Sequence, residues 1–122
     1  MRLTPYRVLV ADDDPTVGLL ARAALPGDTF AVSVAECGTS ALALFRASPF
    51  DIVLLDVEMP GLDGFEVCTK IRRSHGSDFP VLLVTSHHDA DFLARAHELS
   101  AGYIGKPVNW SGLAALLRGL VA

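Results

Sequence analysis

The chain alternates between strand-like and helix-like segments along its whole length, and this alternation limits the possible folds more than any other feature. Short runs rich in Val, Ile and Leu alternate with segments in which apolar residues recur every three or four positions. The predicted strands cover 7–11, 31–35, 50–56, 79–86 and, with a turn, 101–107. The predicted helices cover 15–25, 38–48, 65–73, 89–100 and 109–122. Five strand-then-helix units predict an α/β fold, with a parallel sheet covered by helices on both faces.

Composition limits the class of protein further. The 122 residues fit a single domain over 1–122, with no linker between the units. Although 51% of the residues are hydrophobic, no apolar run approaches the roughly 20 residues that a membrane helix needs. The N-terminus has no apolar block of signal-peptide length, so a cytoplasmic location is expected. The net charge of −4 weighs against nucleic-acid binding, and Cys37 and Cys68 lack the spacing of a redox motif or zinc site.

Acidic, hydroxyl and lysine side chains, which can bind ligands or take part in reactions, lie at the ends of the predicted strands. Asp12 and Asp13 follow the first strand, and Asp56 ends the third. Thr85 and Ser86 end the fourth strand, and Lys106 lies near the end of the fifth. In open α/β sheets, ligands bind outside the carboxyl ends of the strands, near the point where the strand order reverses. We therefore expect these three acids, two hydroxyls and one lysine to meet at one edge of the sheet.

Three carboxylates at one edge repel each other unless one takes up a proton or a cation lies among them. Magnesium, or manganese in its place, fits this need because it prefers oxygen ligands and retains waters and phosphate oxygens in its shell. A phosphoryl group on one of the acids would then meet the metal, the Lys106 ammonium and the Thr85 hydroxyl. Asp14 is assigned a different role, as the N-cap of a helix whose first residue is Pro15.

Four motifs in order resemble the CheY-like receiver domain of two-component response regulators. They are Asp12–Asp13, "DVEMPGLDG" from Asp56, "VTS" at 84–86 and "GKP" at 105–107. The resemblance extends over nearly the whole chain. It implies a (βα)5 doubly wound, flavodoxin-like fold with a five-stranded parallel sheet in the strand order 2-1-3-4-5.

The resemblance also implies roles for the residues at the matching positions. Asp56 matches the aspartate that accepts a phosphoryl group. Asp13 matches a direct metal ligand, Asp12 a ligand through water, and Glu58 the position whose backbone carbonyl completes the metal site. Lys106 matches the lysine that pairs with the phosphoryl group. Such a domain is not an enzyme in the usual sense, but a phosphoacceptor that assists its own phosphorylation and dephosphorylation.

A switch is implied as well. Thr85 matches a hydroxyl that swings towards the phosphoryl oxygen, and Tyr103 matches an aromatic residue that turns inward with it. The surface formed by the fourth helix, fifth strand and fifth helix is then expected to change and to bind partners or a second copy. Glu58 and His87 occupy positions that flank the phosphoryl site, and Pro107 matches a proline preceded by a cis peptide.

The partners implied are a sensor histidine kinase or a phosphotransfer protein, with no direct contact to nucleic acid or membrane. Asn109 and Trp110, in "KPVNW", resemble the ending of receivers that precede diguanylate cyclase or phosphodiesterase domains in c-di-GMP signalling. A stand-alone receiver that acts by protein–protein interaction is the alternative within the family.

A small phosphatase of the haloacid dehalogenase type is an alternative from a different class. Such a phosphatase also uses an aspartate at a strand end with Mg²⁺ and a lysine, and it needs a second carboxylate two residues further on. Glu58 lies at that spacing from Asp56. The acidic pair at Asp12–Asp13 and the short chain fit this alternative poorly.

Overall fold

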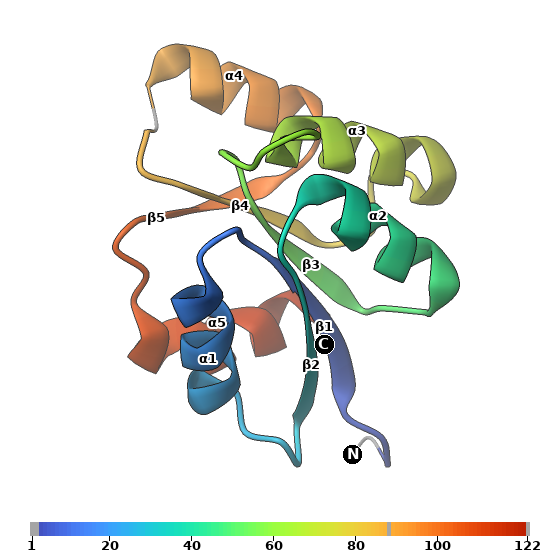
Figure 1. The fold of residues 1–122 in the computed structure, drawn as a ribbon, viewed down its shortest axis with the longest axis vertical. Helices are drawn as coiled ribbons and strands as arrows, with labels where there is room; N and C mark the ends of the chain where they lie inside the picture. Colours follow the sequence, from blue (N-terminus) through green and yellow to red (C-terminus); the bar gives the residue numbers. More distant parts are fainter. Residues whose placement is uncertain (1–2, 88, 122) are drawn as a thin grey trace.

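The computed structural model describes residues 3–87 and 89–121, which form a five-stranded parallel sheet between two layers of helices (Figure 1). The strands are β1 (Tyr6–Ala11), β2 (Phe30–Ala35), β3 (Ile52–Asp56), β4 (Val81–Thr85) and β5 (Gly102–Gly105). The helices are α1 (Pro15–Ala24), α2 (Gly38–Ala47), α3 (Gly64–His75), α4 (Ala90–Glu98) and α5 (Trp110–Val121). The predicted alternation is confirmed, and so is the strand order, β2-β1-β3-β4-β5. The prediction that the last helix reaches Ala122 lies outside the described residues.

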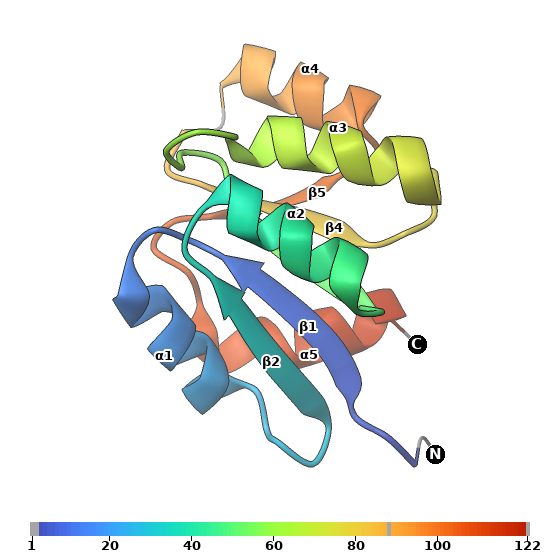
Figure 2. The same cartoon turned by 45° about the vertical axis from the view of Figure 1, so that its right-hand side comes forward.

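Two separate layers of apolar side chains hold the helices to the sheet. Successive side chains of a strand point to opposite faces, so Val8 and Val10 of β1 pack under α1 and α5. Leu9 and Ala11 of the same strand pack under α2, α3 and α4. Figure 2 shows this division, with α1 and α5 on one face of the sheet and the other three helices on the opposite face. Burial on both faces explains why the central strands read as nearly continuous apolar runs.

Aspartate side chains begin three of the helices. The predicted N-cap is confirmed, because the Asp14 carboxylate accepts a hydrogen bond of 2.9 Å from the Thr16 N–H. Asp63 begins α3 in the same way and forms a capping box with Glu66, so this helix starts one residue earlier than predicted. Asp89 caps α4 through the Phe92 N–H at 2.9 Å. These caps place carboxylates at the carboxyl edge of the sheet, where the helices begin.

The fourth strand is shorter than the predicted range 79–86. It begins at Val81, directly after Pro80, whose ring nitrogen has no N–H to donate to the ladder. The Pro80 carbonyl still accepts a hydrogen bond of 3.2 Å from the Val53 N–H. Proline therefore fixes where β4 starts without interrupting its contact with β3.

The α4 helix packs on the sheet through few buried side chains, and the strand beside it, β5, forms an edge of the sheet. Only Phe92 and Ala96 of α4 are buried. In β5, Gly102 and Tyr103 are exposed. The face formed by α4, β5 and α5 is therefore the more open side of the molecule.

Across the described ranges, every helix is too short or too polar to cross a bilayer.

Candidate functional site

The parallel ladders bring the predicted site residues to the same level of the sheet. Ala11 lies opposite Leu55 in the ladder between β1 and β3, so the residues that follow, Asp12 and Asp56, are neighbours. The strand order reverses between these two strands, as expected for a binding site in a doubly wound sheet. Thr85 ends the next strand on the other side of β3. The ladders thus bring Asp12, Asp56 and Thr85 to one edge of the sheet, as predicted.

Asp12, Asp13 and Asp56 form a compact group of carboxylates. One oxygen from each lies within 4.8 Å of the others. Asp12 and Asp56 are only 3% and 4% exposed, whereas Asp13 is open to solvent. Two buried acids with a third at the mouth form a set of oxygen donors that suits a hard cation such as Mg²⁺, which keeps waters on its open side.

Burial makes negative charge costly at Asp12. It raises the pKa of this carboxyl from 3.8 to about 6, and the neighbouring charges of Asp56 and Asp13 add to the rise. The Asp14 N–H donates a hydrogen bond of 2.9 Å to Asp12 Oδ1, and this bond together with Lys106 opposes the shift. The carboxylate is thus held in a place where a further positive charge would stabilise it.

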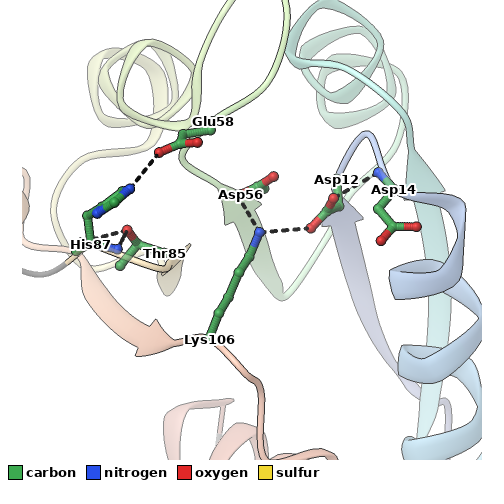
Figure 3. A network of polar contacts seen from close by, with 7 residues as sticks. All are labelled: Asp12, Asp14, Asp56, Glu58, Thr85, His87 and Lys106. Atoms are coloured by element: carbon green, nitrogen blue, oxygen red, sulfur yellow. Dashed lines mark hydrogen bonds and ion pairs between the residues drawn. The ribbon is translucent and has the colours of Figure 1, made fainter.

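Lys106 supplies one positive charge to this group (Figure 3). Its Nζ donates a hydrogen bond of 3.1 Å to Asp56 Oδ1 and lies 3.9 Å from Asp12 Oδ2. Partial burial alone would lower the pKa of Lys106, but the hydrogen bond to Asp56 and the charges of all three acids outweigh it and raise the pKa. One ammonium facing three carboxylates leaves the site short of positive charge, so the residues present fit a divalent cation.

The Thr85 hydroxyl is buried at the same edge but is engaged elsewhere. It donates a hydrogen bond of 2.6 Å to the His87 carbonyl, and the His87 N–H donates one of 2.9 Å back to the hydroxyl oxygen. Figure 3 shows this pair beside Asp56. A hydroxyl has one proton to donate, so Thr85 must leave the carbonyl before it can donate to a phosphoryl oxygen.

Tyr103 lies on the outer side of the sheet. The residue is 47% exposed. Its ring packs edge-to-face against the Phe92 ring, with a centroid distance of 5.8 Å. The structure therefore places this residue in the outward position of the expected switch. Its inward movement stays a prediction.

Glu58 and His87 lie side by side at the mouth of the site, as their flanking positions predicted. Glu58 Oε1 is 3.5 Å from His87 Nε2, and both side chains are largely exposed. Figure 3 shows Glu58 turned towards His87. The next residue, His88, lies outside the described residues. The arrangement leaves the Glu58 side chain engaged with the imidazole at the surface.

Gly64 positions the site, and the sequence analysis did not identify it. A Cβ at this residue would lie 2.6 Å from the Asp56 carbonyl oxygen and 2.9 Å from Val57 Cα. The Gly64 N–H also donates a hydrogen bond of 3.0 Å to the Val57 carbonyl. Only glycine allows α3 to begin this close to the strand that carries Asp56. The sole signal in the sequence was a glycine at the end of a Pro- and Gly-rich loop.

The fold and the site together define a doubly wound α/β domain with a group of three acids, which fits a divalent cation, at the point where the strand order reverses. Residues 8–118 match the family model described as the response regulator receiver domain. The chain belongs to this family. The match favours the predicted receiver over a phosphatase of the haloacid dehalogenase type.

Curated relatives agree with this assignment. The chain is 39% identical over 120 residues to the response regulator MprA of Mycolicibacterium vanbaalenii, covering 96% of this chain and 51% of that protein. It is 36% identical over 120 residues to the transcriptional regulatory protein TcrA of Mycobacterium tuberculosis, covering 98% of this chain and 47% of that protein. The chain thus spans about half the length of these relatives.

Solved structures show the same fold. The chemotaxis protein CheY4 of Vibrio cholerae superposes with a TM-score of 0.87 at 27% identity, covering 96% of this chain and 99% of that one. The BeF3-activated receiver domain of DrrB gives a TM-score of 0.83 at 25% identity, covering 96% of this chain and 97% of that one. The flavodoxin-like, CheY-like architecture is therefore confirmed.

Proposed function

We propose that Asp56 is the phosphoacceptor of this receiver domain. The observation that carries the proposal is the geometry at its carboxylate, which is buried, lies beside two further acids and is 3.1 Å from the Lys106 ammonium. In the proposed step an oxygen of Asp56 attacks the phosphorus of a phosphohistidine on a sensor kinase or phosphotransfer protein. An O–P bond forms, the N–P bond breaks, and its electron pair stays on the imidazole nitrogen.

The metal proposed for the site is Mg²⁺ or Mn²⁺. Asp13 and Asp56 are its direct carboxylate ligands in this proposal, with Asp12 acting through water and Glu58 through its backbone carbonyl. When bound, the ion neutralises the charge of the phosphoryl oxygens. Lys106, whose Nζ lies 3.1 Å from Asp56 Oδ1, would pair with the phosphoryl group as a point charge.

The proposed switch begins at Thr85. Donation to a phosphoryl oxygen would release the His87 carbonyl, which lies two residues before the Asp89 cap of α4. Tyr103, which packs against Phe92 of the same helix, would then turn inward. The altered surface is formed by α4, β5 and α5, where Leu93, Tyr103, Leu116 and Leu120 are exposed.

The output of the switch is proposed at two levels. The more general proposal is that the altered surface controls an output domain, a protein partner or homodimer formation through α4, β5 and α5. The printed name of TcrA favours transcriptional regulation as the output, whereas the "KPVNW" segment favours c-di-GMP turnover by a diguanylate cyclase or phosphodiesterase. A cytoplasmic location is proposed because a kinase that draws on ATP works there.

The acceptor is tested with acetyl phosphate as the donor. We expect the wild-type chain to gain the mass of one phosphoryl group in the presence of Mg²⁺ and none after chelation of the metal. Asp56→Asn should abolish the gain completely, because an amide oxygen is not a competent nucleophile. The control is Asp14→Asn, which changes a neighbouring acid whose role is helix capping and should be phosphorylated like the wild type.

Two results would contradict the proposal. Equal uptake by Asp56→Asn and wild type would move the acceptor to another residue. Continuous hydrolysis of a phosphomonoester such as p-nitrophenyl phosphate, in place of a single stoichiometric modification, would instead support a phosphatase.

A further inference from the structure

The Arg72 side chain of α3 joins three segments of the chain at the end of the sheet opposite the acids. Its Nε donates to the Leu99 carbonyl at 2.6 Å, and Nη2 donates to the Ser100 carbonyl at 3.1 Å. Its Nη1 donates to the carbonyls of Gly76 at 2.9 Å and Phe79 at 2.6 Å. One guanidinium thus connects the end of α3, the segment before β4 and the turn after α4.

The chemistry of these contacts suits an anchor. A guanidinium is planar, permanently charged and carries five N–H donors in a fixed fork. Leu99 and Ser100 follow the last turn of α4, where backbone carbonyls lack partners within the helix and the helix dipole is negative. Ser100 itself has a left-handed backbone, with φ of 53°, that ends the helix. Arg72 therefore caps the carboxyl end of α4 from a neighbouring helix.

Apart from its carboxyl end, α4 is held to the rest of the molecule by a small number of side chains. Phe92 and Ala96 are its only buried side chains, and the Arg95 guanidinium lies over the Phe65 ring at 3.9 Å. The amino end of the helix follows the segment that carries Thr85, whose hydroxyl bonds to the His87 carbonyl. One end of α4 is thus tied to α3 and β4 by a charged side chain, while the other is tied to the residue that must change partners.

We propose that Arg72 is a fixed pivot for α4. When Thr85 exchanges the His87 carbonyl for a phosphoryl oxygen, the amino end of α4 moves and the end at Leu99 and Ser100 stays on Arg72. The helix then swings about its carboxyl end. The direction of this movement rests on the proposed function, but the anchor itself is a property of the unphosphorylated protein.

The anchor is tested in the unphosphorylated protein by amide hydrogen exchange, with Arg72→Met as the variant. The Ser100 and Ala101 amides report on the carboxyl end, since they donate to the carbonyls of His97 and Ala96 at 3.0 and 2.9 Å. We expect them to exchange at least tenfold faster in the variant. The Phe92 and Leu93 amides, at the amino end, should change less than twofold.

Two further variants serve as a matched control and a conservative substitution. Arg73→Met removes the same type of side chain from an exposed neighbouring position on α3, and should leave both ends of α4 unchanged. Arg72→Lys keeps the charge but loses the planar fork, and should accelerate Ser100 and Ala101 to an intermediate degree. It also replaces Arg72→Met if the methionine variant does not fold. Unchanged exchange at Ser100 and Ala101 in the Arg72 variants would overturn the anchor.

The pivot is tested by repeating the exchange with Mg²⁺ and beryllofluoride, a mimic of the phosphoryl group. In the wild type we expect exchange at Phe92 and Leu93 to change at least fivefold, and exchange at Ser100 and Ala101 to change less than twofold. In the folded Arg72 variant both ends should respond. Equal responses at both ends of the wild-type helix would overturn the pivot. No response at either end would contradict the proposed function, and the anchor would then be judged by the exchange of the unphosphorylated Arg72 variants.

Discussion

Both ends of the sheet place one cationic side chain among oxygen atoms brought from distant segments, but the charge balance at the two ends is opposite. At one end Arg72 donates to four neutral carbonyls. At the other, Lys106 faces three carboxylates, and the pKa of Asp12 is raised to about 6. The first group is complete as it stands and stabilises the fold. In the second group the carboxylates repel each other, and the group gains stability when positive charge is added. The difference separates a structural contact from a site prepared for a ligand.

The largest effect on stability is expected from Arg72→Met. Hydrogen bonds from a charged group contribute roughly 1.5–3 kcal/mol each, but the freed carbonyls regain water. We therefore expect the free energy of unfolding to fall by about 3 kcal/mol in urea titrations. Arg73→Met should change it by less than about 0.5 kcal/mol, as exposed substitutions usually do. A fall of similar size in both variants would remove the contrast between a built contact and ordinary surface charge.

Gly64→Ala tests the close backbone approach of α3 to β3 that supports the acidic end of the sheet. We expect this backbone contact, not charge, to determine stability there. The new methyl group would meet the Asp56 carbonyl at 2.6 Å, and neither α3 nor β3 can move without losing contacts. We expect a loss of roughly 2 kcal/mol, within the range for overpacked sites, together with weaker Mg²⁺ binding by calorimetry. Gly27→Ala meets nothing within 4 Å and is the matched control. Equal stability of the two variants would show that the close approach is easily relieved.

Asp12→Asn should stabilise the metal-free protein, the opposite sign to Arg72→Met. The pKa of Asp12 is about 6 in the folded chain against 3.8 as the ordinary value, so the folded state binds more protons between these two pH values. The unfolding free energy contributed by this group therefore falls as pH rises from about 4 to 6, and stays low above pH 6. The full shift corresponds to about 3 kcal/mol, of which we expect roughly 1–2 kcal/mol to be measurable.

The pH dependence of this gain is the measurement that checks it. In chelator, Asp12→Asn and wild type should have equal unfolding free energies near pH 4 and diverge up to pH 7. Mg²⁺ at ten times its Kd should restore about 1.4 kcal/mol to the wild type alone. Asp14→Asn, which keeps its cap, should follow the wild-type curve throughout. A wild type more stable than Asp12→Asn at pH 7 without metal would contradict the view that negative charge at the buried Asp12 destabilises the fold.

The smallest effect is expected at the cap of α3. Asp63→Ala removes the half of the capping box in which the Glu66 N–H donates to the Asp63 carboxylate at 2.8 Å, and keeps the backbone N–H that donates to the Glu66 side chain. Losing such a cap costs about 1 kcal/mol, and Asp63→Asn should recover most of it. Thermal unfolding of the three proteins gives the comparison. If Asp63→Ala is as stable as wild type, the acids along this edge do not serve as ordinary helix caps.

The sequence was sufficient to predict the fold and to predict that the acids and the lysine after the strands lie close together. Alternating periods fixed the order of elements, and strand ends at Asp12, Asp56 and Thr85 placed their side chains at one edge. The four motifs were needed for the strand order and for the individual roles, which periodicity does not contain. Asp14 could be assigned to a cap because proline follows it directly.

Two of the features that escaped prediction depend on backbone atoms from remote segments, and the third depends on a side-chain rotamer. Arg72 bonds to a carbonyl 27 residues away, and every residue has a carbonyl, so no residue type marks the acceptor. The close approach of Gly64 to Asp56 depends on where a loop returns. The outward position of Tyr103 is a choice between rotamers that one sequence permits. Side-chain chemistry can be read from a sequence, whereas the positions of backbone acceptors cannot.

The ladder between β1 and β3 has a consequence for assembly of the chain. Asp12 and Asp56 are neighbours only because Ala11 pairs with Leu55. A slip of one residue would turn the side chains of one strand to the opposite face and part the two acids. The affinity for a divalent ion that we propose would therefore be confined to correctly registered sheets. An ion that binds the native pairing alone draws the population away from misaligned forms by mass action, so the metal would also act as a selector of the properly assembled chain.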